Sequence, residues 1–233
     1  MAIQTGKRFH LIVAIARIGK LFTRINLERE LLGIPDQNTF ERLINKANGF
    51  YALIHRNGNA IYAAVDRVRS IPLFYGVKGN RFFLSDDAEW VRLQVGDTKM
   101  DPIAREEFQL AGYVTGRDTL FSNVKQLQAG EFLVARVNRQ QAVVKCHRYY
   151  RFLHTEPESY DKAKLEHELD EVMVNAIKRL IDYAGGRQIV VPLSGGYDSR
   201  LIVTMLKRLG YGNVFTFTYG VPGNKESRYS KQV

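Results

Sequence analysis

The stretch "FYALIHRNGNAIYAAV", from Phe50 to Val65, decides the fold of the first half of this chain. Phe50–His55 and Ala60–Val65 are apolar runs of strand length, rich in residues that favour sheets. Between them, "RNGN" (Arg56–Asn59) carries the Asn-Gly pair that is typical of a tight hairpin turn. The stretch therefore predicts two antiparallel strands joined by a short turn.

Similar patterns follow on the C-terminal side of this hairpin. Leu73–Val77 and Arg81–Leu84 are apolar or aromatic runs around a second turn signal, "VKGN". A helix is predicted over Ile103–Gln109, and another hairpin over Gly130–Tyr150, "GEFLVARVNRQQAVVKCHRYY". Together these elements predict an α+β fold with an antiparallel sandwich, which we assign to residues 1–153.

Single residues exclude several classes of site. Cys146 is the chain's one cysteine, which excludes a disulfide framework, and we predict that it packs as a small apolar residue. His55, His147 and His154 have no ligand spacing and are predicted to be surface or turn residues rather than metal ligands. The apolar run Leu11–Ala16 is too short to span a membrane, so a soluble cytoplasmic protein is expected.

The charge is basic, with 34 Lys and Arg against 24 Asp and Glu, a net charge of +10. These cationic residues are scattered, without a run of five or more. A basic surface that attracts anionic ligands such as ATP explains this pattern better than a nucleic-acid partner does.

A different pattern appears at "VVPLSGGYDSRL", from Val190 to Leu201. Ile189–Leu193 is apolar without alternation, as expected of a strand covered on both faces of a parallel sheet. From Leu201 to Leu206 the apolar residues are spaced like one face of a helix. The polar residues between them are therefore predicted at a strand-to-helix turn on the carboxyl edge of a sheet, where α/β folds bind ligands.

This turn has the residues of a phosphate site. Gly195 and Gly196 can take positive φ and present successive N–H groups into one concavity. The helix N-terminus favours an anion, Ser194 and Ser199 can donate hydroxyls, and Asp198 can hold a cation bound to the phosphates. The alternative is an ordinary turn in which Asp198 or Ser199 is only an N-cap.

A long amphipathic helix is expected before this strand, from about Tyr160 to Tyr183, after the Pro157-containing "HTEPES" linker. Its predicted buried stripe consists of Leu165, Leu169, Val172, Met173, Ala176 and Leu180. We assign residues 154–233 to the start of an α/β parallel-sheet domain. That domain is expected to be incomplete as given, because two parallel strands cannot bury themselves.

The sequence SGGYDS resembles the S-G-G-x-D-S signature of the PP-loop ATP pyrophosphatases, which cleave ATP between its α and β phosphates. By this resemblance, Ser194, Gly195, Gly196 and Ser199 would cradle the pyrophosphate, and Asp198 would help to hold Mg²⁺. The resemblance implies an adenine nucleotide alpha hydrolase-like domain but not its substrate.

Longer blocks resemble the asparagine synthetases. "NGFYALIHRNGNAIYAAVDRVRSIPLFYG" (Asn48–Gly76) resembles their glutaminase domain with its D-R-x-G-x-x-P-L-Y-Y block. "DPIAREEFQLAGYVTGRDTLFSNVKQLQAGEFLVA" resembles the stretch that leads to T-L-F-x-G-I-x-x-L-x-P-G, and "NVFTFTYGVPGNKESRYSKQV" resembles the second strand of the synthetase domain. The likeness implies an Ntn-hydrolase-like glutaminase domain followed by a PP-loop synthetase domain. It also implies that the backbones of Leu193 and Tyr219 flank the adenine. Glu226 would orient ribose or metal, or is simply a charge in the first turn of a helix.

The first domain departs from that family. The family's nucleophile is a cysteine at the mature N-terminus, whereas this chain begins Met1-Ala2-Ile3. The family's glutamine-binding motifs have no counterpart before Asn48. We therefore expect a shortened domain that has lost glutaminase activity, and no catalytic residue is assigned.

The resemblance implies an ATP-dependent carbon–nitrogen ligase. Such an enzyme adenylates a small-molecule carboxylate, releases pyrophosphate and transfers ammonia or an amine, with ATP and Mg²⁺ as cofactors. β-Lactam synthetases and lasso-peptide cyclases are similar in lacking the cysteine. A PP-loop tRNA-modifying enzyme and a catalytically inactive binding module remain as alternatives. The sheet edge after Thr218 is expected to pair with another copy, giving a homo-oligomer.

Overall fold

The computed structural model describes residues 10–18, 20–22, 30–31, 33–194, 196–219, 225–230 and 232. The chain divides into two compact units, Met1–Leu153 and His154–Val233. Each unit has hydrophobic clusters of its own. Among the described residues, no helix has both the length and the apolar composition needed to cross a lipid bilayer.

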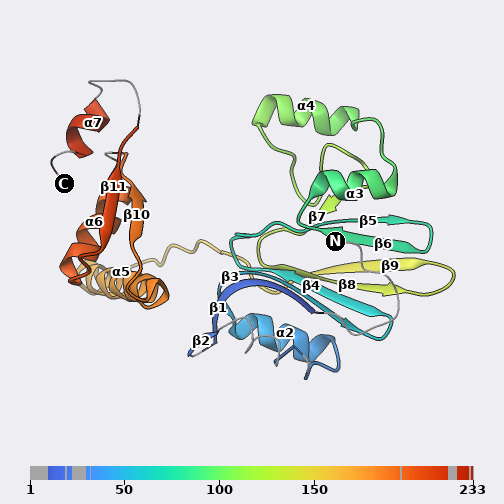
Figure 1. Cartoon of the computed structure of the whole chain (residues 1–233), viewed down its shortest axis with the longest axis horizontal. Coiled ribbons are helices and arrows are strands. Elements are labelled where there is room, and N and C mark those ends of the chain that lie inside the picture. Colours follow the sequence, from blue (N-terminus) through green and yellow to red (C-terminus); the bar gives the residue numbers. More distant parts are fainter. Residues whose placement is uncertain are drawn as a thin grey trace. The chain divides into compact units, whose positions relative to one another are not determined.

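The main sheet of the first unit has six antiparallel strands in the order β2-β1-β3-β4-β8-β9 (Figure 1). The strands are β1 (His10–Ile18), β2 (Lys20–Phe22), β3 (Asn48–Asn57), β4 (Ala60–Val65), β8 (Glu131–Val137) and β9 (Ala142–Arg148). The predicted hairpin is confirmed, since β3 pairs with β4 and Gly58 takes a φ of 60° in the turn. The hairpin predicted over Gly130–Tyr150 is confirmed as β8 and β9.

A second, three-stranded antiparallel sheet has the order β6-β5-β7. Its strands are β5 (Phe74–Lys78), β6 (Arg81–Ser85) and β7 (Lys125–Gln126). The unit also contains the helices α2 (Gln37–Lys46), α3 (Ala88–Val95) and α4 (Pro102–Ala111). The predicted helix Ile103–Gln109 lies within α4 and is confirmed.

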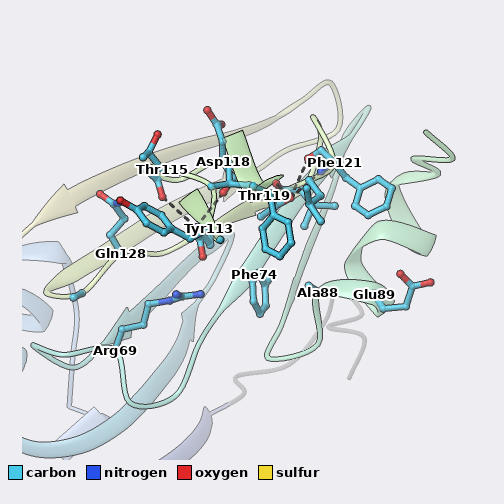
Figure 2. Close-up of a pocket in the computed structure, with 18 of the residues that line it drawn as sticks. Arg69, Phe74, Ala88, Glu89, Tyr113, Thr115, Asp118, Thr119, Phe121 and Gln128 are labelled. Carbon is cyan, nitrogen blue, oxygen red and sulfur yellow. Dashed lines mark hydrogen bonds between the residues drawn. The ribbon is translucent and has the colours of Figure 1, made fainter. Parts of the chain in front are cut away.

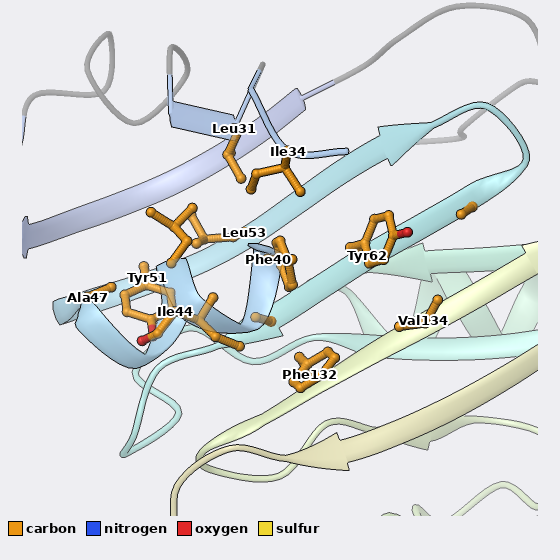
Figure 3. Close-up of a cluster of buried hydrophobic side chains, with 13 residues drawn as sticks. Leu31, Ile34, Phe40, Ile44, Ala47, Tyr51, Leu53, Tyr62, Phe132 and Val134 are labelled. Atoms are coloured by element: carbon orange, nitrogen blue, oxygen red, sulfur yellow. The ribbon is translucent and has the colours of Figure 1, made fainter. Parts of the chain in front are cut away.

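Alternation of side chains along the strands builds these elements into layers. Leu53 packs with α2 on one face of the six-stranded sheet, whereas Ile54 packs with the three-stranded sheet on the other face. Figure 3 shows the first of these clusters, with Phe40 and Ile44 of α2 among the sheet residues Leu53, Tyr62 and Phe132. Because both faces are covered, every residue of β4 is buried. The outer face of the three-stranded sheet is covered by α3, so the unit is an α-β-β-α sandwich.

The second unit contains α5 (Lys162–Ala184), β10 (Ile189–Pro192), α6 (Tyr197–Arg208), β11 (Val214–Phe217) and α7 (Lys225–Ser230). The predicted strand and the helix that follows it are confirmed, and β10 pairs with β11 in parallel. Ile177 of α5, Val191 of β10, and Met205 and Leu206 of α6 form its buried cluster. Both helices therefore pack on one face of the strand pair.

Two predictions about burial in this unit are wrong. Val190 is 52% exposed and Phe215 is 51% exposed, because no described element packs on the second face of β10 and β11. In α5, Leu165, Leu169 and Val172 of the predicted stripe are exposed. The apolar contacts of α5 with α6 and β10 come from its C-terminal half, from Met173 onward, so its fully buried residues lie there.

Candidate functional site

The residues predicted to bind a nucleotide lie at the turn between β10 and α6. Leu193 is buried at the end of the strand. Its N–H donates to the carbonyl of Phe217 over 2.8 Å, and its own carbonyl accepts from the Thr218 hydroxyl over 2.8 Å. These bonds fix the point at which the chain leaves the parallel pair and turns into α6.

The turn brings two of the predicted hydroxyls together. Ser194 Oγ lies 3.3 Å from Ser199 Oγ and accepts from the Gly196 N–H over 3.3 Å. Ser199 Oγ donates to the Gly196 carbonyl over 3.4 Å. Gly195 lies outside the described residues. The two hydroxyls therefore lie together at the first turn of α6, in a position to donate hydrogen bonds to an anion there.

The capping alternative fails in the structure. The N-cap of α6 is Gly196, and it makes no side-chain capping hydrogen bond. Neither Asp198 nor Ser199 caps the helix, since both lie inside it. Within the described part of the chain, the N–H groups of the first turn therefore lack the usual N-cap side-chain acceptor.

The expected reason for glycine at position 196 is wrong. Gly196 has φ −71° and ψ 163°, an extended conformation open to any residue, rather than the positive φ predicted from the sequence. A β carbon added there would lie 3.3 Å from Ser194 Oγ, which is tight but within reach of a small side-chain shift. A positive φ therefore does not require glycine at this position.

The remaining predicted residues are near the surface. Asp198 is exposed in the first turn of α6. Tyr219 is 81% exposed, and its ring stacks on Phe217 with 6.2 Å between centroids. The side chain of Glu226 lies outside the described residues. Within the described part of the chain, no group of three or more His, Cys, Asp or Glu side chains could hold a metal ion.

Sequence reasoning missed Arg200, which stands beside this turn. Its Nε donates to the Gly196 carbonyl over 3.2 Å, and its guanidinium lies 4.7 Å from the centre of the Tyr197 ring. The signal was available, because Arg200 follows SGGYDS directly in the sequence. The turn thus includes a cation as well as hydroxyls and N–H groups.

The first unit contains a pocket of about 800 Å³ that sequence reasoning also missed. Its walls come from the turn after β4, the start of β5, the first turn of α3 and the segment between α4 and β7. Figure 2 shows Arg69, Phe74, Tyr113, Thr115 and Gln128 among its lining residues. These residues are distant in the sequence, and only the fold brings them together.

The turn at the base of this pocket is held by the buried carboxylate of Asp66. This group accepts from the backbone N–H of Tyr51 over 3.0 Å, of Val68 over 3.0 Å and of Ser70 over 3.1 Å. The turn places Arg69 at φ 57°, and Arg69 is the one non-glycine residue with a positive φ among those that the structure describes. The D-R-x-G block quoted above has glycine at this position. The arginine in place of that glycine is the sequence feature that could have indicated the pocket.

Arg69 extends into the pocket (Figure 2). Its guanidinium lies 5.6 Å from the centre of the Phe74 ring. Its Nε is buried and has no hydrogen-bond partner among the described residues. Burial lowers the pKa of the guanidinium from its ordinary value, yet arginine stays protonated at neutral pH. The pocket thus contains a partly desolvated positive charge.

The acidic side chains of the pocket wall already have cationic partners. Glu89 accepts two hydrogen bonds from Arg92, over 2.6 and 2.7 Å. Asp118 accepts from Lys125 Nζ over 2.6 Å. Neither carboxylate is paired with Arg69, so its charge is not compensated from the wall.

Cys146 packs as predicted. It is half-buried against the apolar cluster between the two sheets, and its Sγ lies 3.3 Å from Tyr75 Oη. Burial raises the pKa of its thiol. The thiolate is therefore disfavoured, which is the opposite of what a nucleophile needs.

The prediction that the histidines are surface or turn residues is wrong for two of them. His55 is 2% exposed, its Nε2 lies 3.2 Å from the Ile34 carbonyl and its ring stacks on Tyr62. His147 is half-buried within β9 and stacks on Phe132. His154 is exposed, as predicted.

Comparisons with known proteins identify part of the chain. Residues 36–150 match a family model described as the glutamine amidotransferase domain. A search of curated proteins found no match. This outcome confirms the amidotransferase part of the resemblance, and the synthetase part stays a prediction.

Two solved structures are distantly similar. The first is the glutamine phosphoribosylpyrophosphate amidotransferase from B. subtilis in complex with ADP and GMP. It is 13% identical with a TM-score of 0.36, and the match covers 66% of this chain and 31% of that one. The second is described as the allosteric regulatory enzyme of purine biosynthesis, with 12% identity, a TM-score of 0.37, and 92% and 44% coverage. This chain spans less than half the length of either protein. The family match, rather than these likenesses, identifies the domain: residues 36–150 form a glutamine amidotransferase-like domain.

Proposed function

We propose that the protein is an ATP-dependent ligase that adenylates a carboxylate and joins it to ammonia or an amine. One observation carries this proposal. An amidotransferase-like domain is followed by a parallel strand–turn–helix whose SGGYDS turn gathers two hydroxyls at a helix start without a side-chain cap. An amidotransferase-like domain in the first part and a turn suited to an anion in the second part fit an asparagine synthetase-like enzyme.

The turn would hold the pyrophosphate end of ATP. The first-turn N–H groups of α6 and the Ser194 and Ser199 hydroxyls supply hydrogen-bond donors, and the helix dipole favours the negative charge. Arg200 would add a cation beside them. Mg²⁺ would arrive with ATP, and the exposed Asp198 carboxylate suits a metal that is bound mainly by phosphates and water.

The reaction follows from these roles. A carboxylate oxygen of the substrate attacks the α-phosphorus of ATP, and the bond from that phosphorus to the bridging oxygen breaks to release pyrophosphate. The nitrogen of ammonia or an amine then attacks the acyl carbon, and AMP leaves. The protein's contribution is positioning and neutralising charge on the leaving pyrophosphate. The backbones of Leu193 and Tyr219 would flank the adenine.

The nitrogen source is proposed to be free ammonia or a substrate amine. Cys146, the only cysteine of this sequence, is half-buried beside Tyr75 with a raised thiol pKa. A thiol in this state is a poor nucleophile for glutamine hydrolysis. The amidotransferase-like domain would then serve without releasing ammonia itself.

Binding of MgATP to the full chain, measured by calorimetry, tests the proposal at the turn. Gly196→Ala keeps an allowed backbone conformation, so the free energy of unfolding should change by less than about 0.5 kcal/mol. Its β carbon stands where phosphate must approach, so MgATP affinity should fall by about tenfold or more. Asp198→Ala should weaken binding only when Mg²⁺ is present.

Gly212→Ala is the matched control, because a β carbon there meets nothing within 4 Å. It should leave both stability and MgATP binding unchanged. Acid-dependent exchange between ATP and pyrophosphate, assayed with aspartate, uronic acids and β-amino acids, tests the adenylation step. If Gly196→Ala and Asp198→Ala bind MgATP like the unaltered chain, the turn is not a nucleotide site.

A further inference from the structure

The pocket of the first unit combines a half-buried cation with aromatic walls, and the proposed ligase reaction uses neither. We propose that this pocket binds a small organic carboxylate. The carboxylate of this ligand pairs with the Arg69 guanidinium, and the flat apolar part of the ligand lies against Phe74 and Tyr113. All lining residues belong to the first unit, so this site can be tested without any reference to ATP.

The backbone at Arg69 is the first argument. At φ 57°, a residue with a β carbon is strained and a glycine is not. The bonds to Asp66 impose this conformation whichever residue stands there. A strained residue that persists because its surroundings fix it is typical of ligand sites. The long cationic side chain at this position therefore indicates a use for the guanidinium.

The missing partner of Arg69 is the second argument. Burying part of a charged group costs free energy unless the buried atoms are paired or hydrogen-bonded, and the Arg69 side chain is half-buried. Arg69 makes no ion pair and no side-chain hydrogen bond to any residue that the structure describes, and its Nε is buried. The Phe74 ring faces its guanidinium, with 5.6 Å from the guanidinium carbon to the ring centre. A ligand carboxylate can accept two parallel N–H hydrogen bonds from a guanidinium and so supply the partner that Arg69 lacks among the described residues.

The side chains that line the pocket indicate which class of anion it would bind. Phe74, Phe121 and the exposed Tyr113 provide aromatic surface for a flat apolar body. Gln128 Oε1 is already held by Arg148 over 2.6 Å, so its amide nitrogen is the group that it offers to a ligand. A polar atom on the apolar body would meet this donor.

A phosphate fits this pocket less well than a carboxylate. The start of α3 borders the pocket at Ala88, and a free helix N-terminus would favour phosphate. However, Asp87 caps this helix by accepting from the N–H groups of Glu89 and Trp90. The pocket therefore offers a single unpaired guanidinium, which matches a monoanion better than a dianion.

Benzoate is the probe, with benzamide as its uncharged analogue and inorganic phosphate as the competing anion. Binding to the full chain is followed by NMR, through the shifts of backbone amide signals assigned to the pocket. We expect benzoate to bind with millimolar affinity and to shift the signals of Phe74, Thr115 and Gln128. Benzamide and phosphate should each bind at least about tenfold more weakly, since they lack either the charge or the matching shape.

Arg69→Gly is the decisive variant, because it removes the guanidinium and the backbone strain together. It should weaken benzoate binding by about tenfold or more while raising the melting temperature of the protein. Arg69→Lys keeps the charge without the planar fork and should weaken binding to an intermediate extent. Arg139→Ala removes one positive charge in the exposed turn between β8 and β9, and should not alter binding.

Three outcomes would overturn the proposal. The first is a benzoate affinity that is the same in Arg69→Gly and in the unaltered chain. The second is tighter binding of phosphate than of benzoate, which would mean a general anion site. The third is the absence of any shift of the pocket signals with benzoate at millimolar concentration. None of these results depends on whether the β10–α6 turn binds ATP.

Discussion

A single carboxylate, that of Asp66, organises the turn between β4 and β5. Both of its oxygens accept hydrogen bonds, Oδ1 from Val68 and Oδ2 from Tyr51 and Ser70. The side chain is 1% exposed, so water cannot replace these bonds. The conformation of Arg69 depends on this arrangement, and Asp66 is therefore a positioning residue for the pocket.

Asp66→Asn is expected to lower the free energy of unfolding by about 2–3 kcal/mol. An amide has one acceptor oxygen. The NH₂ group of the introduced asparagine would therefore face backbone N–H groups whose hydrogen bonds the second carboxylate oxygen accepts in the unaltered chain. Urea unfolding followed by circular dichroism measures the change. Asp86→Asn is the matched control, because Asp86 is exposed and its carboxylate accepts one hydrogen bond among the described residues, from the Ser85 hydroxyl. Equal stability of the two variants would contradict the role given to Asp66.

Aspartates also fix where the helices of the first unit begin. Asp36, Asp87 and Asp101 are the N-caps of α2, α3 and α4. Asp101 accepts from the N–H groups of Ile103 and Ala104 and from the Ser122 hydroxyl. The bond from Ala104 is the main cause that lowers the pKa of Asp101, followed by the bond from Ser122.

This lowered pKa predicts how stability depends on pH. A carboxyl whose folded pKa lies below its unfolded value of about 3.9 stabilises the fold above that pH. This contribution is lost as the pH falls through the folded pKa. Unfolding in urea at a series of acidic pH values should therefore show a steeper loss below about pH 3.9 for the unaltered chain than for Asp101→Asn.

Asparagine also caps helices, so at neutral pH the Asp101→Asn variant should be nearly as stable as the unaltered chain. Lys99→Gln changes a nearby charge without touching the cap and should keep the steep acid dependence. Identical acid profiles for Asp101→Asn and the unaltered chain would show that Asp101 contributes nothing to the pH dependence.

The elements that the sequence predicts correctly are those with local signals. Asn-Gly and Gly-Asn pairs between apolar runs predict the hairpins β3–β4 and β5–β6, because the turn residues themselves impose the pairing. Burial in α5 could not be predicted in the same way. Leu165, Leu169 and Val172 continue the apolar spacing along the helix, yet only the C-terminal half packs apolar side chains against α6 and β10. Spacing indicates which face is apolar, but not how much of that face finds a partner.

At the scale of the whole chain, the two units have separate cores and are joined by an exposed segment. Residues 151–161 have no helix or strand and are all exposed. Backbone of this kind enters a protease site without unfolding of a core. The chain should therefore be cleaved there before it is cleaved elsewhere.

Brief trypsin digestion should cut first after Arg151 and leave a resistant fragment that contains β3 to β9. Mass spectrometry of the products identifies the site. Arg151→Gln should slow this first cut, whereas Arg139→Gln should not. A first cut within the six-stranded sheet would contradict the independence of the first unit.

The fold and the two sites differ in how far the sequence predicts them. The β10–α6 turn is contiguous, so its serines could be placed together before the structure was known. The pocket joins residues from position 68 to position 129, and no local pattern links them. His55 shows the same limit, because its burial depends on Ile34 and Tyr62 from other elements. Long-range packing decides both cases.

At position 69, the residue that would make the protein most heat-stable differs from the residue that would bind the ligand. Random mutagenesis with heat survival as the only criterion should repeatedly replace Arg69 by glycine or asparagine, the residues that accept its left-handed backbone. Growth that requires the pocket's ligand should preserve the arginine. Comparing how often Arg69 is replaced under the two selections would therefore show how strongly growth depends on ligand binding in this pocket.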